Sequence, residues 1–184
     1  DMGISCKMLT SRLKEVGFSV EDLDGIFLTH EHIDHVKGLA TFTKKHTVPI
    51  YSSELTWRAI LSKEPKIERR NCRIIGGALK CGEVEINSFE IPHDAVDPHG
   101  YVFKCNGSKC AYITDTGFVT PTVRQAAEDA DTIILEANHD VEMLKNGIYP
   151  PHLKQRILST RGHLSNESAG WLLAHLPRLP ENII

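Results

Sequence analysis

Hydrophobic positions along the chain follow two different spacings. Apolar residues two apart in short runs indicate strands, and apolar residues three and four apart indicate helices. Strands are predicted at 25–29, 48–51, 84–91, 101–104, 110–114 and 132–136, and another strand begins at Ile183. Helices are predicted at 7–16, 36–45, 54–62, 121–130, 141–145, 151–158 and 167–176. This alternation of strands and helices predicts an α/β protein.

Turn and capping residues mark the ends of several segments. Asn106-Gly107 lies between two predicted strands and indicates a tight hairpin, which makes the sheet mixed. Ser53 and Thr120 are predicted helix caps. Two helices are expected to face the core through Met8, Leu9, Leu13 and Val16 in the first and Leu55, Ala59 and Ile60 in the third. No repeat or linker interrupts the pattern, so residues 1–184 are predicted to form one domain.

Composition and charge are those of an ordinary soluble globular protein. Of 184 residues 41% are hydrophobic, and no apolar run approaches the roughly 20 residues of a membrane span. The formal net charge is −3, so no global positive field points to nucleic acid. Five cysteines without a C-x-x-C spacing predict reduced thiols and a cytoplasmic protein. The basic stretch 63–70 is interpreted as solvated surface or, alternatively, as a rim that contacts phosphate.

Four potential metal ligands follow the predicted strand at 25–29. They are His30, His32, Asp34 and His35, in the order His-x-His-x-Asp-His. Residues two apart in an extended chain point the same way, so His30 and His32 can grip one ion while the following turn aims Asp34 and His35 at a second. Imidazole and carboxylate without thiolate suit zinc, manganese or iron. A lone His-x-His would indicate only solvated loop histidines, but the added Asp and His favour a metal site.

Four later segments also carry a His or an Asp at the end of a strand or the start of a loop. They are His93, Asp115, His139 and His163. Each alone is interpreted as structural or solvent-facing. Metal sites are assembled from strand ends that are distant in sequence, so together with 30–35 these residues form a site hypothesis.

The segment 30–35 resembles the signature of the metallo-β-lactamase superfamily. The resemblance implies an αββα-sandwich hydrolase with mixed sheets and two divalent metal ions, zinc or manganese, with iron a third option. It implies that His93 joins His30 and His32 on the first ion, that Asp34 and His35 hold the second, and that Asp115 bridges the two. Two such ions can share a hydroxide that attacks the substrate. Glu31 and Asp94 are candidates for hydrogen bonds to the ligand imidazoles.

Six further runs narrow the resemblance: 1–7, 92–101, 136–140, 149–150, 153–157 and 162–166. Over essentially the whole chain they are similar to the YycJ/WalJ branch of bacterial cytoplasmic exonucleases, which act on DNA from the 5′ end. This implies a metal-dependent phosphodiesterase with a nucleic acid substrate and no membrane partner. Asp34 and His163 are the implied catalytic residues, with His163 a proton donor or phosphate contact and, alternatively, a metal ligand. Asn138, His139 and Ser165 are expected to line the substrate groove.

Two departures from the superfamily pattern stand at the ends of the chain. The superfamily has strands before the segment that here begins at Asp1, and one more metal-ligating His after a strand that here begins at Ile183. The fold is therefore expected to be incomplete at both termini. Two other functions stay open: hydrolysis of a β-lactam or a small ester or thioester, and a metal-deficient fragment without activity.

Overall fold

The structure, a computed structural model, describes all residues from 1 to 184. The chain divides into two compact units. Unit 1 comprises residues 1–76 and 95–99, and unit 2 comprises residues 77–94 and 100–184. Each unit has its own sheet and its own hydrophobic core.

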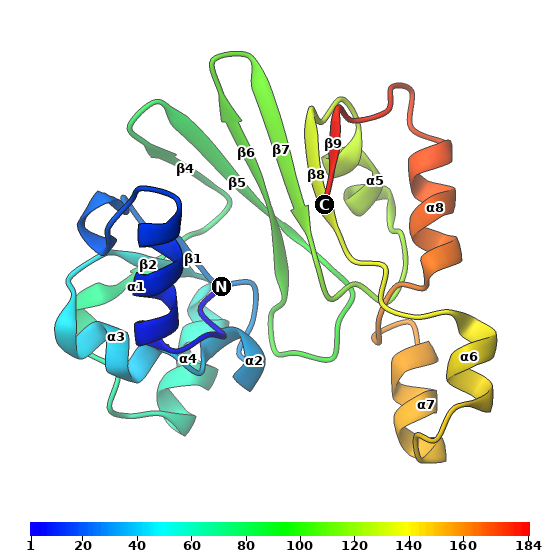
Figure 1. Cartoon of the computed structure of the whole chain (residues 1–184), viewed down its shortest axis with the longest axis horizontal. Helices are drawn as coiled ribbons and strands as arrows, with labels where there is room; N and C mark the ends of the chain where they lie inside the picture. Colours follow the sequence, from blue (N-terminus) through cyan, green and yellow to red (C-terminus); the bar gives the residue numbers. More distant parts are fainter. The chain divides into compact units, whose positions relative to one another are not determined.

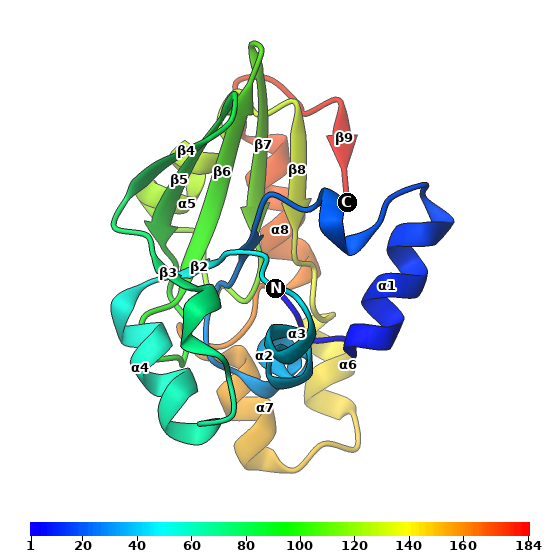
Figure 2. The same ribbon diagram turned by 90° about the vertical axis from the view of Figure 1, so that its left-hand side faces the viewer.

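Unit 1 contains a small parallel sheet with the order β1-β2-β3. Figures 1 and 2 show helices packed around these short strands. The strands are β1 (Ile26–Phe27), β2 (Ile50–Ser52) and β3 (Cys72–Ile74). The helices are α1 (Cys6–Glu15), α2 (Ile33–Val36), α3 (Leu39–Lys45) and α4 (Glu54–Lys63), with short 3₁₀ turns η1 (Val20–Asp22) and η2 (Arg69–Asn71).

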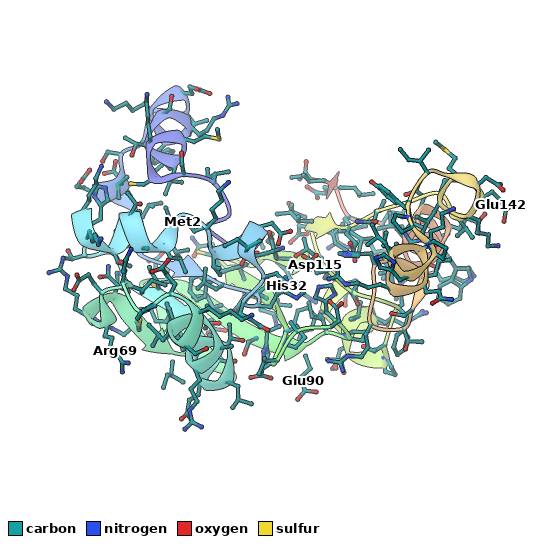
Figure 3. All side chains as sticks on the ribbon, turned by 90° about the horizontal axis from the view of Figure 1, so that it is seen from below. Met2, His32, Arg69, Glu90, Asp115 and Glu142 are labelled. Carbon is teal, nitrogen blue, oxygen red and sulfur yellow. The ribbon has the colours of Figure 1, made fainter.

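The core of unit 1 forms where these helices meet the sheet. Leu28, Phe42 and Ile50 are fully buried, and Trp57 and Ile60 of α4 pack into the same cluster. Met2 joins them with 1% of its surface exposed, and Figure 3 shows its side chain within this unit. The N-terminal stretch is therefore anchored in the core.

Unit 2 contains a six-stranded mixed sheet with the order β4-β5-β6-β7-β8-β9. Its strands are β4 (Ala78–Cys81), β5 (Val84–Glu90), β6 (His99–Cys105), β7 (Ser108–Ile113), β8 (Thr132–Leu135) and β9 (Asn182–Ile183), of which only His99 belongs to unit 1. β6 and β7 are antiparallel, whereas β8 runs parallel to both β7 and β9. Its helices are α5 (Pro121–Ala127), α6 (Val141–Asn146), α7 (Pro151–Leu158) and α8 (Asn166–Ala174).

Two helices cover one face of this larger sheet. Figures 1 and 2 show α5 and α8 on the same side of the strands, with α6 and α7 beyond their lower end. The core between them includes Val123 of α5, Ile113 and Ile133 of the sheet, and Leu172 of α8, all fully buried. The lower end, where β7 and β8 finish, carries the loops that hold polar side chains.

The structure confirms the α/β class and most predicted elements. Asn106 and Gly107 both adopt positive φ, 50° and 83°, and join β6 to β7 as the predicted two-residue hairpin. Ser53 and Thr120 accept hydrogen bonds from Thr56 N and Val123 N as the predicted caps. β9 pairs with β8, which confirms a strand at Ile183.

The structure departs from the predicted elements in two places. The helix predicted at 36–45 begins only at Leu39, as α3, and the separate short helix α2 precedes it, because Gly38 interrupts the helical run and donates its N–H to the carbonyl of Met2. The strands β3 and β4 were missed because neither buries an alternating face. The prediction of one domain over residues 1–184 stays a prediction beside the two units.

Three residues predicted to face the core lie at the surface. Met8, Val16 and Leu55 are 50%, 67% and 47% exposed. The buried stripe of α1 runs instead through Cys6, Leu9 and Leu13, and that of α4 through Thr56, Trp57 and Ile60. A shift of one residue turns a side chain by about 100° around a helix, which is enough to move it out of the core.

Two broader expectations concern thiols and membranes. All five cysteines are free. No helix combines the length and the apolar character that crossing a bilayer requires.

Candidate metal ligands in each unit

The ligand segment of unit 1 begins where β1 ends. Leu28 is fully buried, and the chain then continues without regular structure until His32 caps the start of α2. His30 is completely buried, while His32 is partly exposed. Contrary to expectation, Asp34 and His35 lie on the short helix α2 and not in a loop.

Three imidazoles meet within this segment. Nε2 of His30 lies 2.9 Å from Nδ1 of His32, and the two rings meet edge to face with centroids 4.5 Å apart. The ring of His35 lies 4.1 Å from that of His30. Asp34 stands at the margin with 76% of its side chain exposed, and its Oδ2 is 3.6 Å from Nε2 of His35. The structure thus brings the three imidazoles together, whereas the carboxylate of Asp34 contacts only His35.

A carboxylate that the sequence did not single out supports these rings. Asp1 accepts a hydrogen bond from Thr29 N at 2.8 Å, and its Oδ2 lies 3.0 Å from Nδ1 of His35. The hydroxyl of Thr29 lies 3.1 Å from Asp1 Oδ2 and 2.9 Å from Nδ1 of His30. Such contacts fix the orientation and tautomer of a ligating imidazole. Asp1 and Thr29 therefore hold His30 and His35 in place.

The backbone next to Asp1 packs closely against α2, the helix that carries Asp34 and His35. Met2 donates its N–H to the carbonyl of His35 at 2.7 Å. A Cβ atom on Gly3 would lie 1.5 Å from the carbonyl oxygen of Asp34, so only glycine fits there. The position of Asp1 is consequently fixed by close main-chain contacts of the next two residues with α2.

Unit 2 holds a second set of potential ligands: His93, Asp115 and His163. One ligand atom from each lies within 4.8 Å of the others. His93 follows β5, Asp115 follows β7, and His163 precedes α8. Residues separated by up to 70 positions in sequence thus converge, as the site hypothesis predicted.

His93 is the most deeply buried member of this set, with 1% exposed. Its Nδ1 lies 3.0 Å from the carbonyl of Gly162, and its Nε2 lies 3.3 Å from Asp94. Burial lowers the pKa of His93, against the opposing effect of the Gly162 carbonyl and the nearby carboxylates. A neutral imidazole is the form that binds metals. Asp94 contacts a ligand imidazole as predicted and also binds Arg156.

Asp115 is held in an unusual backbone conformation. Its φ is 54°, in the left-handed region that few residues other than glycine adopt. The next two amides are both bound: Thr116 N donates to Glu136 at 2.6 Å and Gly117 N donates to the carbonyl of Pro92. Backbone strain of this kind persists where surrounding contacts impose it.

Glu136, at the end of the strand predicted at 132–136, organises the unit 2 set. Its carboxylate accepts from Thr116 N and Leu164 N and lies 2.9 Å from Nδ1 of His163. This bond raises the pKa of His163, although burial opposes it. Because Glu136 occupies Nδ1, Nε2 is the atom through which His163 can act.

The three predicted substrate residues lie next to this set. Asn138 N donates to the carbonyl of Leu164, and His139 pairs with Ser165 as an isolated parallel bridge. Nδ1 of His139 is buried without a hydrogen bond, and burial lowers the pKa of this residue. The hydroxyl of Ser165 caps α8 through Ser168 N at 3.1 Å. The substrate role of all three stays a prediction.

The structure also bears on two other expectations. Glu31 does not contact an imidazole, because its carboxylate accepts from Val96 N at 3.1 Å. Within the basic stretch, Lys63, Lys66 and Arg69 are exposed, and Figure 3 shows Arg69 at the surface of unit 1. Neighbouring Arg73 is also exposed and donates to the carbonyls of Arg70 and Cys72.

The donor atoms of both sets fit divalent metal ions. They are imidazole nitrogens and carboxylate oxygens without a thiolate, which suits zinc, manganese or iron. His30 and His93 are buried, so a bound ion would be shielded from water on that side. Each set also carries the outer carboxylate that ligating imidazoles require, Asp1 in unit 1 and Glu136 in unit 2.

Comparison with known proteins gives consistent matches. The family described as beta-lactamase superfamily domain matches residues 7–180. Exodeoxyribonuclease YycJ of Bacillus anthracis is 39% identical over 176 residues, which is 95% of this chain and 67% of the relative. Exodeoxyribonuclease WalJ of Streptococcus pneumoniae is 42% identical over 171 residues, 91% of this chain and 64% of the relative. The chain thus spans about two thirds of the length of these relatives.

A solved structure agrees with the fold. The metallo-beta-lactamase fold protein YhfI of Bacillus subtilis superposes with a TM-score of 0.67 at 19% identity, over 98% of this chain and 72% of that one. At this identity the match concerns the fold alone. Together these matches confirm the fold, the family resemblance and the hydrolase class predicted from the sequence.

Proposed function

Because the chain belongs to the beta-lactamase superfamily, we propose that it is a metal-dependent phosphodiesterase that degrades DNA as an exonuclease. One observation carries the proposal: a converged His93–Asp115–His163 set occurs in a chain whose relatives are named exodeoxyribonucleases. The substrate, a DNA strand with a 5′ end, follows from the same resemblance.

The proposed cofactor is a pair of divalent ions, zinc or manganese, with iron a third option. The ligands are the unit 1 set, His30, His32, Asp34 and His35, and members of the unit 2 set, His93 and Asp115. When bound, such ions supply an activated water molecule and offset negative charge on the scissile phosphate. The role of each ligand is the one implied by the superfamily resemblance.

The chain's own residues contribute orientation and proton transfer. Asp1 and Thr29 fix His30 and His35, and Asp94 contacts His93. Glu136 directs Nδ1 of His163 toward itself and favours the protonated imidazole. Nε2 of His163 can then give a proton to the leaving oxygen of the phosphodiester, which is the role we propose for it. A ligand role for the same atom is the alternative.

DNA binding and cellular location are part of the proposal. The exposed cations Lys63, Lys66 and Arg69 support contact with phosphates, although the net charge is −3. Five free thiols support a cytoplasmic location.

A paired hydrolysis assay tests the function. The full natural protein, loaded with manganese or zinc, is incubated in parallel assays with 5′-phosphorylated double-stranded DNA and with a chromogenic β-lactam. The Asp34→Ala variant is the control. We expect DNA loss that disappears in the control and no turnover of the β-lactam. Turnover of the β-lactam alone would assign the protein to hydrolysis of small amides, and DNA loss undiminished by Asp34→Ala would remove the proposed metal loop from the reaction.

A further inference from the structure

A pocket in unit 2 includes two of the predicted substrate residues, Asn138 and His139, and extends beyond them to helix α6. It has a volume of about 490 Å³ and lies between the segment after β8, helix α6 and the loop before α7. Small-molecule sites commonly enclose about 300–1,000 Å³. The side chains used in the following argument are Asn138, Met143, Ile148, Tyr149 and Asn166.

The pocket exposes apolar and aromatic surface that a folded chain normally covers. Ile148 is 100% exposed, Met143 76% and Tyr149 52%, and all three line the same pocket. Scattered single residues of this kind are common, but a contiguous group marks a binding surface. Tyrosine offers a flat face, and methionine adapts to the shape of a partner.

The polar side chains of the pocket are two amides, the imidazole of His139 and the carboxylate of Asp140. Asn138 and Asn166 are both exposed, and only their backbone groups take part in hydrogen bonds. Their side-chain amides can therefore donate to and accept from a ligand. No lysine or arginine lines the pocket, and the carboxylate of Asp140 does. A phosphate would be repelled here, whereas an uncharged ring with donors and acceptors on its edge would be accommodated.

The pocket adjoins the unit 2 ligand set through the backbone. Residues 137–140 directly follow Glu136, the partner of His163. Asn138 N donates to the carbonyl of Leu164, and Asn166 N donates to the carbonyl of His139, both at 2.9 Å. The two strands of chain that border the pocket are therefore the same two that carry Glu136 and His163. A nucleotide whose phosphate lies at His163 would place its neighbouring base within reach of the pocket.

We propose that this pocket binds one unpaired nucleobase of the DNA strand being degraded. The base would stack on Tyr149 against Met143 and Ile148, and the amides of Asn138 and Asn166 would contact its edge. Stacking on aromatic rings is the usual way in which proteins hold single-stranded bases, and asparagine pairs with base edges. The inference rests on the proposed function and adds that the enzyme holds an unstacked base beside the reacting phosphate.

The test compares intact DNA with DNA that lacks one base. The metal-loaded full natural protein is given 5′-phosphorylated oligonucleotides with a tetrahydrofuran abasic site at each of the first four positions in turn, and kcat/KM is measured. One position is expected to show a preference for the intact base of roughly 5- to 150-fold, the range that a base–aromatic stack contributes. Tyr149→Ala should reduce that preference to near unity while kcat/KM on the abasic DNA stays unchanged. Asn138→Ala should reduce it partly.

Two matched variants keep the test specific. Tyr149→Phe retains the ring and should retain the preference. Trp171→Ala removes another exposed aromatic, which stacks on His175 directly after α8 and does not line the pocket, and should leave the preference intact. The inference is overturned if no position shows a preference that depends on Tyr149. It is also overturned if Tyr149→Ala lowers hydrolysis of intact and abasic DNA equally, because Tyr149 would then support the fold or the metal site and not a base. Absence of DNA hydrolysis by the unaltered protein would instead overturn the proposed function and the inference with it.

Discussion

At the scale of residues, two carboxylates decide how the ligand imidazoles point. Glu136 satisfies three donors at once, among them Nδ1 of His163, and Asp1 contacts both Thr29 and His35. Neither residue belongs to a recognisable spacing of ligands. The histidines are visible in the sequence because they are rare and closely spaced, whereas a carboxylate at a strand end or in a loop is common and takes its role only from what the fold brings beside it.

Replacing Glu136 with Gln should separate orientation from folding. The amide keeps one acceptor for the backbone donors, but its NH₂ group faces Nδ1 of His163 and withdraws the charge that stabilises the imidazolium. We expect DNA hydrolysis to fall by about 10- to 100-fold, the usual effect of removing a carboxylate behind a functional imidazole. Steady-state kinetics measure this, with Glu142→Gln as the control. Glu142 lies on α6 and pairs only with Lys145 at the surface, where Figure 3 shows it. Equal activity of the two variants would rule out the role given to Glu136.

The substitution Asp1→Asn addresses the unit 1 ligands in the same way. The neutral amide cannot stabilise the His35 ring as the carboxylate does, so we expect metal affinity to fall by about 10- to 100-fold. Competition with a chromogenic chelator measures the affinity in the full natural protein. Asp24→Asn, at an exposed position of the same unit, should bind metal like the unaltered protein. Unchanged affinity in Asp1→Asn would show that this carboxylate does not position the ligands.

At the scale of elements, what the sequence predicted depended on how strongly each segment buries one face. The hairpin at Asn106-Gly107 and the strand β8 were predictable because their turn chemistry and apolar runs are decided locally. The strands β3 and β4 were not, because their pairing partners and not their own side chains determine them. The break between α2 and α3 depends on Met2, which lies 36 residues away from Gly38 in sequence and could not be inferred from local periodicity.

One carboxylate links three elements of unit 2. Asp131, just before β8, accepts from Lys109 N of β7 at 2.7 Å and from Arg178 ahead of β9 at 2.9 Å. The Lys109 backbone bond, followed by the Arg178 bond, holds the pKa of Asp131 below its usual range. A lowered pKa in the folded state means that the carboxylate stabilises the fold above the unfolded pKa of about 3.9. This contribution is lost as the pH falls through the folded pKa.

Asp131→Asn should therefore destabilise the protein in a pH-dependent manner. The difference in free energy of unfolding from the unaltered protein should be full at pH 6–7 and should shrink as the pH drops below about 4. Urea titrations at a series of pH values measure it. Glu181→Gln, at a nearby exposed carboxylate, should show little difference at any pH. A difference for Asp131→Asn that is the same at pH 7 and pH 3.5 would contradict the charged contact.

At the scale of the whole molecule, charge and chemistry are distributed unevenly between surface and interior. The chain is mildly acidic, yet its exposed stretch 63–70 is basic. If these side chains contact phosphates, each contact releases condensed cations. A plot of log affinity for duplex DNA against log salt concentration then has a negative slope, whose magnitude grows by about 0.9 for each contact. The double substitution Lys66→Ala with Arg69→Ala should therefore lower the slope by about 2.

Fluorescence anisotropy at several salt concentrations measures this slope. Lys7→Ala, an exposed cation on α1, provides the control and should leave the slope unchanged. A slope equal to that of the unaltered protein would mean that the stretch 63–70 is simply solvated surface, the other interpretation of the sequence.

Each unit presents its own nitrogen and oxygen donors, and the proposed function requires that these donors bind divalent metal ions. The most direct test is elemental analysis of the full natural protein and of three single variants, His32→Ala in unit 1, His93→Ala in unit 2 and His175→Ala at the surface. We predict up to two divalent ions in the unaltered protein and a clear loss of metal in the first two variants. His175→Ala should keep the full metal content, because the His175 ring stacks on Trp171 at the surface. Full metal content in His32→Ala and His93→Ala, or a protein that binds no metal, would contradict the account.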